Sequence, residues 1–175
     1  LGPTAMDGIR RLVNPSRLGS DQLEWTSEAN PESFTREVAD GWRSAGVNRV
    51  SLGVQSFHEA SLRWMGRIHG AAGAGEAVRT ARAAGFENLS VDLIFGLPEH
   101  LNRDLGQDLD QVLALDADHV SLYSLSVESG TPLGRSVAEG SEAVASEARY
   151  ESEYVMAVER LKEAGYEAYE VSNLA

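Results

Sequence analysis

The chain has 175 residues, of which 42% are hydrophobic and 24% are charged, a balance typical of a globular protein with one sizeable core. Its net charge of −12 disfavours binding to nucleic-acid backbones and to anionic membranes. It contains no cysteine, which excludes disulfides, thiolate zinc sites and cysteine-held iron–sulfur clusters within this sequence. Because it shows neither a long apolar run nor the layout of a secretory signal, we expect a cytoplasmic location.

The first predicted strand is LEWTSE at residues 23–28, and a helix from Pro31 to Ala45 follows it. Asn30 suits the N-cap of this helix, because its side-chain oxygen can accept a backbone N–H bond and proline is favoured at the first helical position. An apolar stripe at helical spacing indicates that one side of the helix is buried. The stripe consists of Phe34, Val38, Trp42 and Ala45.

Strands and helices alternate along the rest of the chain. Three β-branched or aromatic runs predict strands at residues 49–55, 89–95 and 119–127. Three helices end at Gly46, Gly85 and Gly165, which suit the left-handed position that terminates a helix. This alternation predicts an α/β fold with about four parallel strands and a further strand near the C-terminus.

The last predicted helix follows an unusually long connection. Residues 128–143 separate it from the strand at 119–127, and this length exceeds that of a typical βα loop. Such a loop on the rim of a barrel either covers a site or is a solvated insertion, and both interpretations remain open. The buried stripes of the last two helices are predicted to be Leu105, Leu109 and Val112, and Tyr154, Val158 and Leu161.

Each predicted strand has one apolar face and one small or polar face, because side chains alternate with a period of two. Ser51, Gly53 and Gln55 share the polar face of the second strand, and Ser90 and Asp92 share that of the third. The apolar faces suit contact with helices. The polar faces indicate a lumen that receives a ligand, since a barrel filled with aliphatic side chains would show the opposite bias.

Five residues are candidates for binding that ligand. Ligands of parallel βα folds lie beyond the carboxyl ends of the strands, where Glu28, Gln55 and Ser126 are found. Arg67 lies where the helix after Gln55 ends. Asp92 lies inside an apolar strand, where a carboxylate requires a partner or a ligand.

Each candidate also has a purely structural interpretation. Glu28 would cap the following helix, Gln55 would satisfy backbone groups, and Arg67 would be a surface residue. Asp92 would form a buried ion pair with Arg49. The sequence contains no nucleophile elbow, zinc-protease motif or Walker motif, and its four histidines lack metal-ligand spacing. We therefore predict no catalytic residue and no metal ligand in this chain.

Six motifs occur in a recognisable order. They are EANPESF at 28–34, GVNRVSLGVQSF at 46–57, MGRIH at 65–69, VDLIFGLP at 91–98, HVSLYSLSVESGTPL at 119–133 and YEVSN at 169–173. Together they closely resemble the oxygen-independent coproporphyrinogen oxidase-like branch of the radical S-adenosylmethionine superfamily. The fifth and sixth motifs are most similar to the haem chaperone subfamily. The resemblance covers nearly the whole chain.

The resemblance implies a partial (β/α)6 barrel, truncated at its N-terminal side, that binds S-adenosylmethionine across the strand ends. The motif positions that contact this cofactor in the family are occupied by Glu28, Gln55, Arg67, Asp92 and Ser126. Arg67 would pair with the methionyl carboxylate and Glu28 with the ammonium group. Gln55 and Asp92 would bind the ribose hydroxyls.

Three motifs of the family are missing from the sequence. These are the three-cysteine motif that holds a [4Fe–4S] cluster, the glycine-rich loop that follows the second strand, and the haem-associated stretch that follows YEVSN in the chaperones. We therefore interpret residues 1–175 as a single incomplete core domain. The cluster and haem would be bound only in the full-length protein.

The leading hypothesis is a portion of a haem chaperone, which binds S-adenosylmethionine and delivers haem to an acceptor protein. One alternative is an oxygen-independent coproporphyrinogen III oxidase, an oxidoreductase that oxidatively decarboxylates propionate side chains in haem biosynthesis. Whether the protein is an enzyme stays open. A second alternative is a cluster-free descendant that binds a ligand or acts as a scaffold. Nucleic acid is not an expected partner, and neither is the interior of a membrane.

Overall fold

One sheet of five strands organises the molecule. The structure, a computed structural model, describes residues 2–13 and 23–175. The strands are β1 (Thr26–Ala29), β2 (Arg49–Gln55), β3 (Asn88–Phe95), β4 (His119–Ser124) and β5 (Asn173–Leu174). They follow the chain in spatial order, with β1 to β4 parallel and β5 antiparallel to β4. The predicted α/β fold with a mostly parallel sheet is therefore confirmed.

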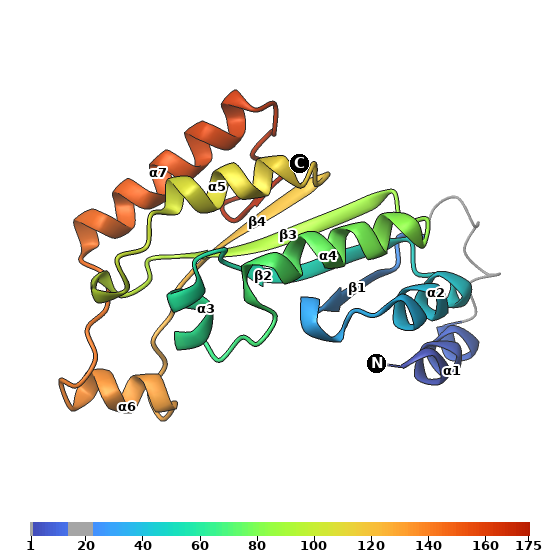
Figure 1. Cartoon of the computed structure of the whole chain (residues 1–175), viewed down its shortest axis with the longest axis horizontal. Coiled ribbons are helices and arrows are strands. Elements are labelled where there is room, and N and C mark those ends of the chain that lie inside the picture. The colour runs from blue at the N-terminus through green and yellow to red at the C-terminus, as the bar shows by residue number, and fades with distance from the viewer. Residues whose placement is uncertain (1, 14–22) are drawn as a thin grey trace.

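Helices connect the strands and cover one side of the sheet (Figure 1). Figure 1 shows α2, α4, α5 and α7 lying along the same side, and α3 and α6 lying beyond the end of the sheet where β2 and β4 finish. The helices are α1 (Pro3–Val13), α2 (Arg36–Ala45), α3 (Glu59–Trp64), α4 (Gly70–Ala83), α5 (Leu105–Ala114), α6 (Pro132–Ala138) and α7 (Glu147–Glu163), with short 3-10 turns η2 (Pro31–Ser33) and η3 (Glu99–Leu101).

The core lies between these helices and the apolar face of the sheet. Every second residue of β2, β3 and β4 is fully or almost fully buried against the helices, as the alternation predicts. The helical stripes supply the other side of the core, including Trp42, Leu109 and Leu161. The core residues of the sheet are Val50, Leu52, Val54, Leu89, Val91, Leu93, Phe95, Val120 and Leu122.

The predicted bounds of β1, α2 and β4 differ from the observed ones, and so does the predicted N-cap. The helix after the first strand begins at Arg36, because the Thr35 hydroxyl accepts the Val38 N–H and caps it there. Asn30 precedes a 3-10 turn instead, and its side chain caps no N–H group. The fourth strand ends at Ser124, so Ser126 lies beyond it.

The long connection at 128–143 is partly helical. Its helix α6 begins after Thr131, whose hydroxyl accepts the N–H of Gly134, and proline occupies the first helical position. The longest helix in the described ranges, α7, has 17 residues. None of the helices described is long and apolar enough to cross a membrane.

We predict that Leu93→Ala lowers the free energy of unfolding by about 2–5 kcal/mol, because it removes a fully buried side chain from the central strand and leaves a cavity. Leu12→Ala is the matched control, since Leu12 is 87% exposed on α1 and its loss should change the free energy by less than about 0.5 kcal/mol. Denaturant titration of both variants measures the difference, and equal effects would contradict this assignment of the core.

Candidate functional site

The face of the sheet opposite the core carries small and polar side chains from neighbouring strands. Glu28 of β1 pairs in register with Ser51 of β2, and Asp92 of β3 pairs with Ser121 of β4. The Ser51 hydroxyl donates a hydrogen bond of 2.9 Å to Asp92 Oδ1. These side chains therefore form a continuous polar strip across four parallel strands.

Burial shapes the electrostatics of Asp92. It raises the pKa of the carboxyl group, while hydrogen bonds from Ser51 and Ser121 act in the opposite direction. The charge of the Glu28 carboxylate raises the pKa of Asp92 further, and the charge of Arg49 lowers it. Within the described part of the chain, Arg49 forms no ion pair with Asp92, and its guanidinium instead donates to Thr26 Oγ1. The structural interpretation of Asp92 as the partner of Arg49 is therefore wrong.

The end of β2 brings the Gln55 side chain back over the strand. A Cβ atom placed on Gly53 would lie 2.8 Å from Gln55 Nε2 and 3.3 Å from Asn30 Oδ1. Any larger residue at position 53 would therefore displace the Gln55 amide, which explains the glycine in this otherwise apolar strand. The amide is largely buried and lies close to the end of β1.

Arg67 joins the same group of side chains. Its guanidinium donates a hydrogen bond of 2.5 Å to Asn30 Oδ1 across 37 residues of sequence. Asn30 follows β1 directly, whereas Arg67 lies in the turn between α3 and α4. Asn30 thus brings together the ends of β1 and β2 with Arg67, a role that the N-cap prediction missed.

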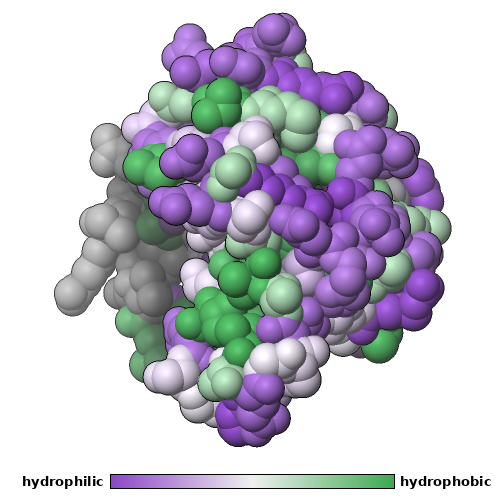
Figure 2. Space-filling model, turned by 90° about the vertical axis from the view of Figure 1, so that its left-hand side faces the viewer, coloured by the Kyte–Doolittle hydropathy of each residue, from purple (hydrophilic) through white to green (hydrophobic). Residues whose placement is uncertain are grey.

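A cavity of about 460 Å³ lies beside Arg67 at the carboxyl ends of the strands. Figure 2 views this end of the molecule and shows a cluster of hydrophobic surface bordered by hydrophilic side chains. Ile94 also lines the cavity; it lies two residues beyond Asp92 on the same face of β3. The lining residues are Trp64, Met65, Arg67, Ile94, Leu125, Pro132, Leu133, Ser136 and Glu142.

The long connection covers this cavity. Helix α6 contributes Pro132 and Leu133 to the lining, which favours the interpretation of residues 128–143 as the cover of a site. The connection is tied to α3 by a hydrogen bond of 2.9 Å from Trp64 Nε1 to Glu142 Oε2. That bond lowers the pKa of Glu142. The cavity therefore combines apolar walls with a fixed guanidinium at one side.

The five predicted site residues do not all occupy equivalent positions. Arg67 donates to Asn30, and both Asn30 Oδ1 and the Gln55 amide lie beside Gly53. Glu28 and Asp92 lie on the same face, with Ser51 between them. Ser126 is exposed after the end of β4, and among the described residues no hydrogen bond or ion pair links it to the other four. Its neighbour Leu125 lines the cavity.

Comparisons with known proteins agree with this architecture. A sequence profile described as "Radical SAM superfamily" matches residues 5–112. The chain is 36% identical to the heme chaperone HemW of Bacillus subtilis over 170 residues, and 40% identical to that of Mycobacterium tuberculosis over 173 residues. These alignments cover 97% and 99% of this chain and 44% of each relative. The chain therefore spans less than half the length of these relatives.

A solved structure shows the same fold. The coproporphyrinogen III oxidase HemN of Escherichia coli, described as a radical SAM enzyme, superposes with a TM-score of 0.82 at 22% sequence identity. The superposition covers 100% of this chain and 40% of that one. The predicted partial barrel is thereby confirmed at the level of the fold.

We predict that Asp92→Asn is more stable than the wild type near neutral pH, and that its advantage disappears in acid. Because burial raises the pKa of Asp92 in the folded protein, the charged form destabilises the fold at high pH. As the pH falls through the raised pKa towards the ordinary range of aspartate, the wild type takes up its proton first when folded and regains stability. Denaturant titrations between pH 7 and 4 measure the free energy of unfolding of both proteins. Ionisable groups that the two proteins share contribute equally to both values and cancel in the difference. A pH-independent difference would contradict it.

Proposed function

The chain belongs to the radical SAM superfamily, and from this we propose that the polar strip and the strand ends beside it bind S-adenosylmethionine. The observation that supports this proposal most directly is the convergence of Arg67, Asn30 and the Gln55 amide at the ends of β1 and β2. These groups come from three separate parts of the chain, and one of them, Arg67, also lines an open cavity.

The donors and acceptors match the chemistry of the cofactor. The Arg67 guanidinium, which donates to Asn30, would pair with the methionyl carboxylate. Glu28 is exposed and, in the described ranges, has no hydrogen-bond or ion-pair partner, so its carboxylate is available for the ammonium group. The Gln55 amide and the Asp92 carboxylate are suited to ribose hydroxyls. Ser126 completes the proposed set from the segment after β4.

The fit of the polar strip to a nucleoside rests on its small side chains. Gly53 has no side chain, so the Gln55 amide can lie over β2 in the space that a side chain at position 53 would fill. A [4Fe–4S] cluster does not fit this chain in the same way, because the sequence holds no cysteine. Cluster ligands would have to come from outside these 175 residues.

We further propose that the full-length protein containing this sequence is a haem chaperone, located in the cytoplasm, that delivers haem to an acceptor protein. The support comes from relatives named heme chaperone that align with nearly the whole chain at 36% and 40% identity. In such a chaperone, S-adenosylmethionine and the cluster would control the transfer of haem to the acceptor protein.

A coproporphyrinogen III oxidase is the second candidate. The open cavity of about 460 Å³ beside Arg67 favours it, since its apolar side chains can contact the macrocycle of coproporphyrinogen while the guanidinium faces one of the ionised propionates. The fold of an oxidase of this type superposes on the whole chain.

We predict that Arg67→Ala in the full-length protein weakens S-adenosylmethionine binding by about 2 kcal/mol or more, roughly 30-fold, because a charge-assisted pair is lost from a partly desolvated site. Arg63→Ala is the control: Arg63 is 70% exposed on α3, and its ion pair with Glu59 lies away from the cavity lining. Titration calorimetry under anaerobic conditions measures both. If the Arg67 variant binds as tightly as the wild type, Arg67 is not part of the site.

Two assays on the same full-length protein separate the two candidate functions. For the haem chaperone, we expect stable binding of added haem, seen as a shifted haem absorption band, and no consumption of coproporphyrinogen. For the oxidase, anaerobic incubation with S-adenosylmethionine and coproporphyrinogen should yield protoporphyrinogen, detected by chromatography after oxidation to the fluorescent porphyrin. Product formation without haem binding would overturn the chaperone proposal.

A further inference from the structure

Gln55 adopts a backbone conformation that is unusual for a residue with a side chain. Its φ is 69°, in the left-handed region, and the N–H of Ser56 donates to the carbonyl of Val54 across it at 2.9 Å. This three-residue turn is rare and strained when its central φ is positive. The pairing of β2 with β3 also shifts by one residue between Leu52 and Gln55. Such irregularities redirect side chains at the ends of strands, and they persist only where surrounding contacts hold them.

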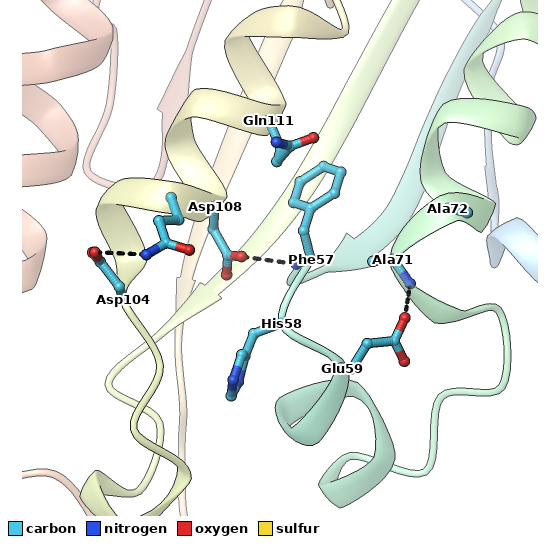
Figure 3. A pocket seen from close by; sticks show the side chains of 9 residues that line it. Phe57, His58, Glu59, Ala71, Ala72, Asp104, Asp108 and Gln111 are labelled. Atoms are coloured by element: carbon cyan, nitrogen blue, oxygen red, sulfur yellow. Dashed lines mark hydrogen bonds between the residues drawn. The ribbon is translucent and has the colours of Figure 1, made fainter.

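Both carboxylate oxygens of Asp108 hold the residues that follow this turn. The Ser56 hydroxyl donates to Asp108 Oδ2 at 2.6 Å, and the Phe57 N–H donates to Asp108 Oδ1 at 2.9 Å. Figure 3 shows Asp108 reaching from α5 towards Phe57, in a cavity of about 570 Å³ on the side of the sheet covered by helices. Ser56 is fully buried and Asp108 is 2% exposed, so water does not compete for these bonds.

Asp108 is itself fixed by a buried ionic network. Arg103 contacts Asp108 at 3.4 Å and Glu153 of α7 at 3.2 Å, and it donates to the carbonyl of Ile94 at 2.5 Å. Glu153 in turn accepts the N–H of Gly96 just after β3. The network therefore anchors the carboxyl ends of both β2 and β3.

The chain bears an energetic cost for this arrangement. Burial raises the pKa of Asp108, although bonds from Ser56 and Phe57 and the charge of Arg103 oppose the shift. Buried ionic networks are often no more stable than apolar residues of the same volume, so stability alone gives little reason to place a carboxylate there. Its two bonds instead fix the segment that carries Gln55.

We propose that Asp108 is a positioning residue of the S-adenosylmethionine site, acting from the opposite side of the sheet through the turn at Gln55. It holds the Gln55 amide beside Asn30 and Arg67, so that the cofactor meets an acceptor and a donor already in place. The inference rests on the proposed function, and it adds a residue that makes no contact with the cofactor itself.

The test is a double-mutant cycle in the full-length protein, with S-adenosylmethionine affinity as the readout. We expect Asp108→Asn and Ser56→Ala each to weaken binding by about tenfold in the wild-type background, and by less than about twofold when Gln55 is already alanine. Ser56→Ala leaves the ionic network intact, so it carries the test if the buried charge of Arg103 prevents the Asp108 variant from folding. Asp110→Asn is the control, because Asp110 lies two residues away on α5 and pairs with Arg160 at the surface.

The outcomes separate this inference from the proposed function. Equal weakening in both backgrounds would show that Asp108 acts through general stability and not through Gln55, and wild-type affinity in both variants would remove Asp108 from the site altogether. Either result overturns the positioning role while the binding site stands. A wild-type protein that fails to bind S-adenosylmethionine would instead overturn the proposed function, and the role of Asp108 with it.

Discussion

Apolar packing of helices against a single face of the sheet is the constraint on which the rest of this structure depends. The helices α2, α4, α5 and α7 cover the aliphatic side chains of β2, β3 and β4, and the opposite face retains Ser51, Asp92 and Ser121. Because all four principal strands are parallel, their carboxyl ends meet at one edge. The polar face and that edge are therefore adjacent, and a ligand bound there touches several strands at once.

Stability and binding make opposite demands on this region. Asp92 and Glu28 place two carboxylates on one face, and the charge of Glu28 disfavours ionisation of Asp92. The turn at Gln55 is strained, and a carboxylate is buried on α5 to hold it. Strain and buried charge of this kind are tolerated where the surrounding fold supplies enough stabilisation, and they are characteristic of binding sites. The fully buried core of β2 and β3 supplies it here.

Local patterns in the sequence predicted much of the fold, and long-range contacts account for what they missed. The period-two alternation assigned both faces of β2 and β3, because the direction of a strand side chain depends only on its position along the strand. The contact between Asn30 and Arg67 spans 37 residues, and a cap at Asn30 was locally the simpler expectation. The turn at Gln55 escaped prediction because glutamine, unlike glycine or asparagine, does not signal a positive φ. Helix α6 was missed because its seven residues are too few to show a period.

The position of β1 decides how the sheet can be extended. β1 lies at the edge of the sheet and, among the described residues, pairs only with β2. Its outer backbone groups select a partner by direction and length more than by side-chain identity, so a strand supplied by a second polypeptide could complement it as well as one from the same chain. Such complementation would also enclose Glu28. A carboxylate moved from solvent into a medium of lower dielectric constant attracts a nearby cation more strongly. Addition of a strand beside β1 and binding of a positively charged group at Glu28 would therefore reinforce each other.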